Sequence, residues 1–287
     1  MKGADAHSVA SEVLDRNEGE APLLVDVAGS SDVGHAQPTD VVYSARWWVL
    51  FVYSMFAMLQ GWLWGDLGPI SDSMLDVYGI NSDTVQLMLN WGPIMYILFS
   101  FPFAYAMDRP GGVRVTVVLS MGLVALGAIL RAAAPLNSST TAIGMLHVGY
   151  MLNDIAGPVA MSAVTLVSEG WFPRGERGLA TAIAAEANVF GNVMSFLVGP
   201  AMLAGVDPAS GIRRYHYLCA GIALATLAAT IIYFPSHAPT PPSHSAATAK
   251  AAEERFSLTA FRAALRGLSR NVPFLVLCGA YGLSGGA

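Results

Sequence analysis

Residues 91–114 read WGPIMYILFSFPFAYAMDRPGGVR, and this stretch decides the fold. Its apolar part extends back to Thr84 and carries no charged side chain before Asp108. An uncharged run of about twenty residues can cross a bilayer core of roughly 30 Å as a helix. The run ends in a glycine-rich turn whose charges are Asp108, Arg109 and Arg114. The stretch therefore predicts a membrane-spanning helix that ends at a short turn on the membrane surface.

The composition of the whole chain also indicates a membrane protein. Of its 287 residues, 54% are hydrophobic and only 12% are charged, about half the charged fraction of a soluble domain. No basic run favours a nucleic-acid partner, and the cysteines, Cys219 and Cys278, lie in apolar runs that predict no disulfide framework. The sequence shows no phosphate-cradling glycine loop, metal-ligand cluster or nucleophile triad. We therefore expect neither an enzyme nor a cofactor or metal site.

Six long apolar runs predict the architecture. Each should be a helix, because a lipid-exposed backbone must satisfy its own hydrogen bonds. The expected spans are residues 45–77, 84–107, 113–134, 141–167, 177–203 and 215–234. Together they predict an all-α membrane protein whose partner is the lipid bilayer.

The sequence divides into four segments. Residues 1–43 are acidic, rich in Ser and Gly, and without periodicity, so we expect a disordered cytoplasmic tail. Residues 44–235 hold the six spans, and residues 236–270 form a cytoplasmic loop that includes a basic amphipathic helix. Residues 271–287 begin a seventh apolar run that barely reaches spanning length, so we expect a truncated span and a chain that is a fragment.

Lysine and arginine are distributed unequally between the two sides of the membrane. Three of the fifteen, Arg131, Arg213 and Arg214, fall on the side opposite the N-terminus. The other twelve share the N-terminal side with the long loop. Because cytoplasmic loops carry the excess of these residues, we expect the N-terminus and the loop in the cytoplasm.

Gly-Pro pairs occur in four of the six spans. They are residues 68–69, 92–93, 157–158 and 199–200. Proline removes a backbone donor and bends a helix, and interruptions in two corresponding three-span units indicate a binding site between them. The alternative is that such pairs are simply common in membrane helices. A row of small residues in the fifth span, Ala187, Gly191, Ser195 and Gly199, predicts close packing against another helix.

Several short stretches carry a resemblance to a known family. They are residues 60–64 (QGWLW), 91–94 (WGPI), 156–158 (AGP) and 189–192 (VFGN). Over about residues 45–235 the chain resembles solute carrier family 49 of the major facilitator superfamily, whose members include the feline leukaemia virus subgroup C receptor proteins. The resemblance implies a twelve-span carrier. This chain would hold its N-terminal six-helix bundle and the start of the seventh helix, and the C-terminal bundle would be a missing partner.

The same resemblance suggests a gate at the turn after residue 107. In the superfamily an acid–arginine–glycine turn between spans 2 and 3 belongs to a cytoplasmic charge network that stabilises the outward-open state. Here the turn supplies Asp108, Arg109 and Arg114, although the glycine usually found upstream is Ala104. The residues expected to complete the gate are Glu169, Glu176 and Arg177. The alternative is that these charges only fix the topology.

Few ionisable groups lie inside the expected spans, and such groups are costly in lipid and usually functional. The candidates for proton coupling are Asp66, His147, Asp154 and Glu186. Histidine titrates near neutrality, and His147 lies two helical turns before Asp154 on the same face. The alternative for each acid is a pairing with a polar group of a neighbouring span.

A second set of residues within the spans could contact a substrate. These candidates are Gln60, Trp64, Asn90, Asn153, Gly157 and Asn192. Gln60 and Trp64 share one helix face, and an indole suits an organic cation or a flat heteroaromatic ring. By resemblance, Trp64 matches the choline-binding tryptophan of the virus-receptor proteins, whereas their span-4 glutamine is replaced by Gly157. The alternative for Trp64 is simple packing.

These patterns favour a secondary active transporter that moves a small organic solute by alternating access. The resemblance suggests a vitamin-like solute such as pyridoxine, or an organic cation, and the intramembrane acids favour protons as the coupled ion. One alternative is a non-transporting half-carrier. Another is a seven-helix receptor, which the expected cytoplasmic N-terminus and the Asp108-Arg109 turn after the second span disfavour.

Residues 18–24 (EGEAPLL) resemble an acidic dileucine sorting signal. They favour the lysosomal membrane, with the plasma membrane as the alternative.

Overall fold

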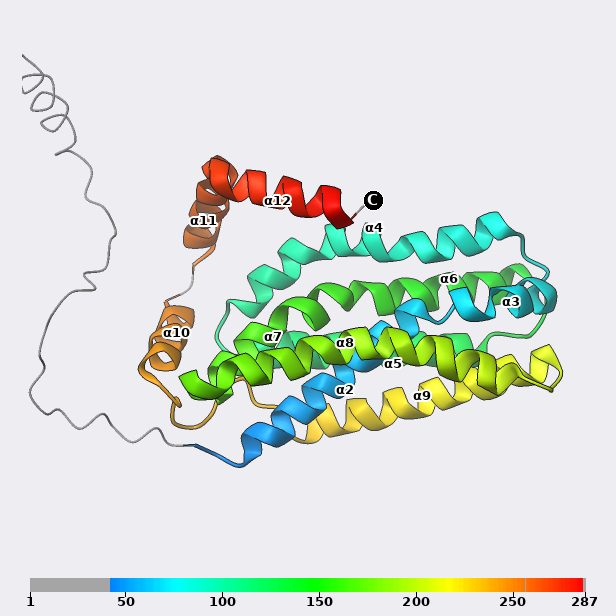
Figure 1. Ribbon diagram of the computed structural model, residues 1–287, viewed down its shortest axis with the longest axis horizontal. Coiled ribbons are helices and arrows are strands. Elements are labelled where there is room, and N and C mark those ends of the chain that lie inside the picture. The colour runs from blue at the N-terminus through cyan, green and yellow to red at the C-terminus, as the bar shows by residue number, and fades with distance from the viewer. Residues whose placement is uncertain (1–41, 256, 286–287) are drawn as a thin grey trace, which may run out of the picture. The chain divides into compact units, whose positions relative to one another are not determined.

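The computed structural model describes residues 42–255 and 257–285, with side chains up to position 280. The predictions for residues 1–41, including the sorting signal, lie outside the described residues. The described chain is all-α and has six stretches long and apolar enough to cross a membrane (Figure 1). They are α2 (Ala45–Gly65), α4 (Ser82–Met107), α5 (Gly112–Ala133), α6 with α7 (Thr140–Trp171), α8 (Arg174–Leu203) and α9 (Pro208–Ile232). The predicted fold class is confirmed.

The first span is shorter than the sequence suggested, because its helix ends at Gly65. A 3-10 turn, η1 (Gly68–Ile70), and the short helix α3 (Ser71–Tyr78) follow it. Pro69 stands at the start of this turn and has no N–H to continue the ladder of α2. The fourth span is divided at Ala156 into α6 (Thr140–Ile155) and α7 (Gly157–Trp171), just before Pro158.

Not every proline breaks its helix. Pro93 and Pro102 lie inside α4, and Pro200 lies inside α8, without interrupting either helix. Only two of the four Gly-Pro pairs therefore mark a break, and the internal repeat stays a prediction. Helix α9 begins at Pro208, earlier than expected, because Asp207 caps it by accepting a hydrogen bond from the Ser210 amide at 3.0 Å.

The bundle is organised around α2, which packs most extensively against α8. The row of small residues on α8 explains how closely the two helices approach, as predicted: Gly191, Ser195 and Gly199 are all buried. A Cβ atom at Gly191 would overlap the carbonyl oxygen of Met58, and one at Gly61 would overlap that of Asn188. Close packing of this kind replaces the hydrophobic effect as the force between helices in lipid.

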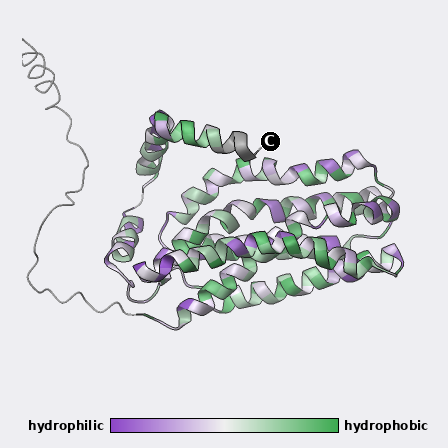
Figure 2. Cartoon of the chain, in the orientation of Figure 1, coloured by the Kyte–Doolittle hydropathy of each residue, from purple (hydrophilic) through white to green (hydrophobic). Residues whose placement is uncertain are grey.

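The spans differ in how far the bundle buries them. The most apolar windows of α2 and of α6–α7 are 61% buried, whereas those of α4 and α8 are only 22% buried. Beyond its charged first turn, hydrophobic residues nevertheless recur along α8 (Figure 2). Helices α4 and α8 thus present broad apolar faces away from the rest of the bundle.

Three shorter helices follow the sixth span. They are α10 (His244–Glu254), α11 (Leu258–Arg270) and α12 (Val272–Gly285). The sequence predicted one helix in the 236–270 loop, and the described part of this loop contains two.

Candidate functional site

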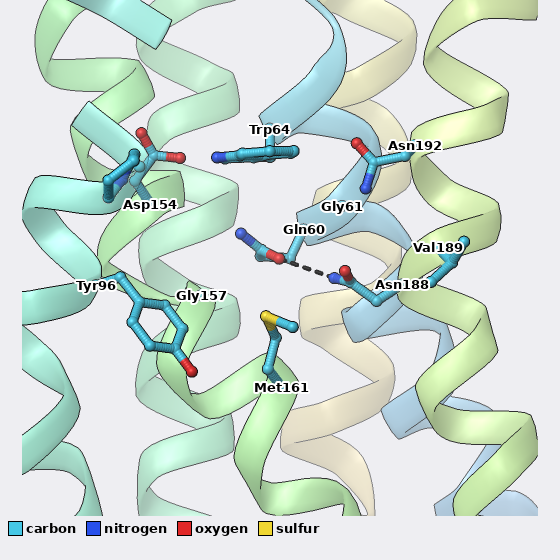
Figure 3. Close-up of a pocket in the computed structure, with 12 residues that line it drawn as sticks. Gln60, Gly61, Trp64, Tyr96, Asp154, Gly157, Met161, Asn188, Val189 and Asn192 are labelled. Carbon is cyan, nitrogen blue, oxygen red and sulfur yellow. Dashed lines mark hydrogen bonds between the residues drawn. The ribbon is translucent and has the colours of Figure 1, made fainter. Parts of the chain in front are cut away.

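A cavity of about 390 Å³ lies between the middle parts of the spans (Figure 3). Helices α2, α4, α6, α7 and α8 all contribute to its wall. The lining residues are Gln60, Gly61, Trp64, Gly92, Pro93, Tyr96, Asp154, Gly157, Met161, Asn188, Val189 and Asn192. The wall is mostly apolar with a few convergent polar groups, which is the usual character of a small-molecule site.

The structure brings together four of the six predicted substrate contacts. Gln60, Trp64, Gly157 and Asn192 line the cavity. The other two lie outside this lining. Asn90 is exposed on α4. Asn153 is buried, and its side-chain amide donates a hydrogen bond to the backbone carbonyl of Gln60 at 3.3 Å.

Several lining residues were not predicted as substrate contacts. Tyr96 and Met161 add an aromatic ring and a thioether to the wall, and Asn188 adds an amide. Tyr96 lies four residues after Gly92, one helical turn further along α4, so the Gly-Pro motif could have located this face.

Gln60 is held in place by α8. Asn188 Nδ2 donates to Gln60 Oε1 at 2.9 Å and to the Ala57 carbonyl at 2.9 Å. Because its oxygen is already engaged, Gln60 presents its amide nitrogen to the cavity (Figure 3). Gln60 can therefore act as a fixed hydrogen-bond donor toward a ligand.

Trp64 forms one end of the cavity as drawn in Figure 3, and 47% of its surface is exposed. Its indole nitrogen lies directly against Gly92, where a Cβ atom would overlap it. The glycine of the WGPI motif thus makes room for the indole.

Of the four predicted coupling residues, only Asp154 lines the cavity, and it is just 4% exposed. Asp66 is fully buried and pairs with Arg131 at 3.1 Å. The guanidinium also lies 4.6 Å from the centre of the Tyr150 ring. Asp66 therefore has the neighbouring partner that the sequence offered as the alternative to coupling.

The two remaining coupling candidates face other surroundings. His147 accepts a hydrogen bond from Trp91 Nε1 through its Nδ1 atom at 3.1 Å, which joins α6 to α4. Glu186 is exposed on α8, outside the cavity lining. Asp154 is thus the candidate best placed to meet a substrate and a proton in one space.

The predicted gate residues gather at the turns after α4 and α7. Gly111 has φ +69°, a left-handed conformation that glycine adopts at little cost, so α4 can reverse into α5 within a few residues. Arg177 pairs with Glu169 at 3.3 Å. Arg109 lies over the Tyr105 ring at 5.1 Å, and the Arg114 amide donates to Ser236 Oγ at 3.0 Å.

Glu176, also named as a gate residue, pairs with Arg46 at the start of α2, at 3.0 Å. The ion pairs that Glu169, Glu176 and Arg177 form therefore join the α7–α8 turn to itself and to α2. Asp108 faces a different group, Glu253 of α10, across a second cavity of about 250 Å³.

Helix α10 is docked against this end of the bundle. Arg177 Nη2 donates to Ser243 Oγ at 2.6 Å, and the Ala238 amide donates to the Gly170 carbonyl at 3.2 Å. Within the segment, His237 Nε2 lies 3.0 Å from Glu253 Oε1. The sequence showed only a polar, proline-rich loop here, although Ser243 caps α10 and was a readable start signal.

Docking of α10 should weaken as the pH rises from about 4.5 to about 7. Burial first, and then the nearby Asp108 carboxyl, raise the pKa of Glu253 from 4.5 to about 7. An acid whose pKa is raised by folding contributes stability that is present below its unfolded value and lost as the pH rises through the folded value. Burial lowers the pKa of His237 below 6.5, so His237 titrates in the same range and has to be present in the control protein as well.

Hydrogen exchange of the α10 amides between pH 5 and 8 measures this effect. The matched control is Glu253→Gln. Dividing the exchange rate of the wild-type α10 amides by that of the variant at each pH cancels the intrinsic dependence of exchange on pH. We expect the ratio of wild-type to Glu253→Gln exchange rates to rise several-fold between pH 5 and 7 and to level off above pH 7. A ratio that stays constant would show that Glu253 does not control docking.

Comparison with known proteins gives one consistent result. Residues 47–287 match the Major Facilitator Superfamily. The chain is 35% identical over 256 residues to a solute carrier family 49 member 4 homolog of Xenopus tropicalis, covering 84% of this chain and 54% of that protein. It is 25% identical over 289 residues to the choline/ethanolamine transporter flvcr2b of Danio rerio, covering 99% and 58%. It is 27% identical over 264 residues to the choline/ethanolamine transporter FLVCR1 of Felis catus, covering 88% and 45%. The chain spans about half the length of these relatives.

Proposed function

Because the chain belongs to the major facilitator superfamily, and within it to solute carrier family 49, we propose that it forms half of a secondary transporter. The observation that carries this proposal is the cavity lined by Gln60, Trp64 and Asp154. Helices α4 and α8, both part of its wall, are the least buried spans. A second six-span half would cover them, and rocking of the two halves would expose the cavity to each side in turn.

The wall chemistry supports a small organic solute with a flat or cationic part. Trp64 and Tyr96 offer aromatic surfaces, which attract cations and stack on rings. Asp154 offers the negative charge, and the Gln60 amide offers a donor. Pyridoxine has a flat ring with hydroxyl groups, and choline has a quaternary cation, so both suit this wall. Two relatives are choline/ethanolamine transporters by name, which supports the organic-cation alternative.

Proton coupling through Asp154 is part of the proposal, because an acid in the cavity can exchange a proton as the substrate enters. The test is uptake of radiolabelled pyridoxine and choline into proteoliposomes that contain this chain with a second half. Asp154→Asn should abolish the dependence of uptake on an imposed pH gradient. Glu186→Gln removes an acid outside the cavity and should preserve that dependence. Unchanged pH dependence in Asp154→Asn would contradict proton coupling through Asp154.

The alternative to a transporter is a non-transporting half-carrier; the chain spans about half the length of its relatives. The same proteoliposomes decide between them. A half-carrier predicts no uptake when the chain is reconstituted alone or with a second half, whereas a transporter predicts uptake only with the second half.

We place the N-terminus on the cytoplasmic side and the protein in the lysosomal membrane, with the plasma membrane as the alternative. The unequal distribution of arginine supports the sidedness. Glycosylation of an acceptor site inserted at the N-terminus would contradict it.

A further inference from the structure

Helix α11 separates its residues into an apolar row and a basic row. Leu258, Phe261, Leu265 and Leu268 recur every three or four residues along one side. Arg262, Arg266 and Arg270 recur every four residues along the other side. This spacing places each set on its own face of the helix. The helix carries no acidic residue, so the basic row has no internal counter-charge.

The described chain covers the apolar row only in part, since Phe261 and Leu265 are partly exposed and the two residues at its ends are exposed. None of the α11 residues is buried, and Leu258 and Leu268 are 45% and 44% exposed. A helix of 13 residues is marginal on its own in water. Its formation therefore requires a surface that takes up the apolar row.

The position of α11 in the chain indicates which surface this is. Its last residue, Arg270, is separated by one residue from the apolar helix α12. At its other end, the Phe261 ring packs edge-on against Tyr105 at 5.3 Å, and Tyr105 lies in the last turn of the span α4. Both connections hold α11 at the level where the spans leave the membrane.

We propose that α11 binds the surface of the bilayer, with its apolar row among the acyl chains and its arginines on anionic lipid headgroups. A helix with a basic face opposite an apolar face lies in the interfacial plane, and its affinity depends on the charge of the lipid. Each arginine near such a surface strengthens binding by about fivefold. The inference rests on the proposed function in one respect: the proposed sidedness places α11 at the cytoplasmic leaflet, which is anionic.

The test uses the whole chain in nanodiscs of phosphatidylcholine, with or without phosphatidylserine. Amide exchange of residues 258–270 should slow at least about tenfold when phosphatidylserine is present. Arg262→Gln with Arg266→Gln should abolish most of this slowing. Arg213→Gln with Arg214→Gln is the matched control, because it removes two exposed arginines from the opposite end of the spans and should leave the slowing intact.

A second measurement separates lipid from a protein partner. Spin labels on Ala264→Cys, beside the apolar row, and on Ala263→Cys, toward the basic row, are compared in a background without Cys219 and Cys278. We expect oxygen dissolved in the bilayer to relax the label at 264 more than the label at 263. Exchange that is equally slow in both lipids, or a label at 264 that oxygen does not reach, would mean that protein covers the helix and would overturn the proposal. Neither readout measures transport. A result that overturns the membrane-surface proposal would therefore leave the proposed function untouched.

Discussion

Replacing Trp64 by alanine is expected to weaken substrate binding about thirtyfold. Trp64 is 47% exposed in this half. Once the second half and the substrate exclude water from the indole, a cation or ring held against it gains about 2 kcal/mol, which corresponds to that factor. Trp64 lies in the cavity wall, and Gly92 leaves the space in which its indole lies. The measurement is the concentration of choline or pyridoxine that half-saturates binding to the chain reconstituted with its second half.

The matched control for this prediction is Trp48→Ala. Trp48 lies near the start of α2, is 43% exposed, and donates from Nε1 to the Tyr233 carbonyl at 3.1 Å. Losing it removes the same amount of side chain without touching the cavity. Equal losses of binding in the two variants would contradict the assignment of Trp64 to the substrate site.

Breaking the pair between Asp66 and Arg131 is expected to destabilise the bundle by about 3–5 kcal/mol. Both side chains are essentially buried, and their atoms lie 3.1 Å apart. Arg131→Met leaves the Asp66 carboxylate without a counter-charge in a low-dielectric interior, and that is the costly step. The measurement is the free energy of unfolding in detergent, from denaturant titration.

The double variant, Asp66→Leu with Arg131→Met, tells whether the loss comes from the uncompensated charge. Replacing a whole buried pair by apolar residues of similar volume is often neutral, so the double variant should recover most of the stability. If the double variant is as unstable as the sum of the two single variants, the two residues do not act as a pair.

The sequence was sufficient for the architecture because length and charge carry that information. The uncharged run before Asp108 became α4, and the turn after it does contain a positive-φ glycine at Gly111. The positions of the prolines predicted the helix breaks less well. Pro69 and Pro158 stand at helix breaks, whereas Pro93 and Pro200 do not, because a helix in a bundle can tolerate the missing donor.

The site was harder to predict, because the pattern of a single span does not reveal its neighbours. Asn153 and Asp154 are adjacent in the chain, yet only Asp154 lines the cavity, and this depends on how α6 is rotated against α2. Asp66 and Arg131 lie in different spans, and nothing local indicates that they meet. The same holds for Glu253, whose approach to Asp108 depends on the docking of α10.

The central claim is that this cavity is the chain's share of a substrate site. Its most direct test is the reaction of Met161→Cys with a water-soluble thiol reagent, in a background without Cys219 and Cys278. Met161 lines the cavity, whereas Ser138, replaced in the same way as a control, is exposed in the loop between α5 and α6, where water reaches it. We expect choline or pyridoxine to slow modification at 161 and not at 138. Equal rates at 161 with and without both solutes would contradict the central claim.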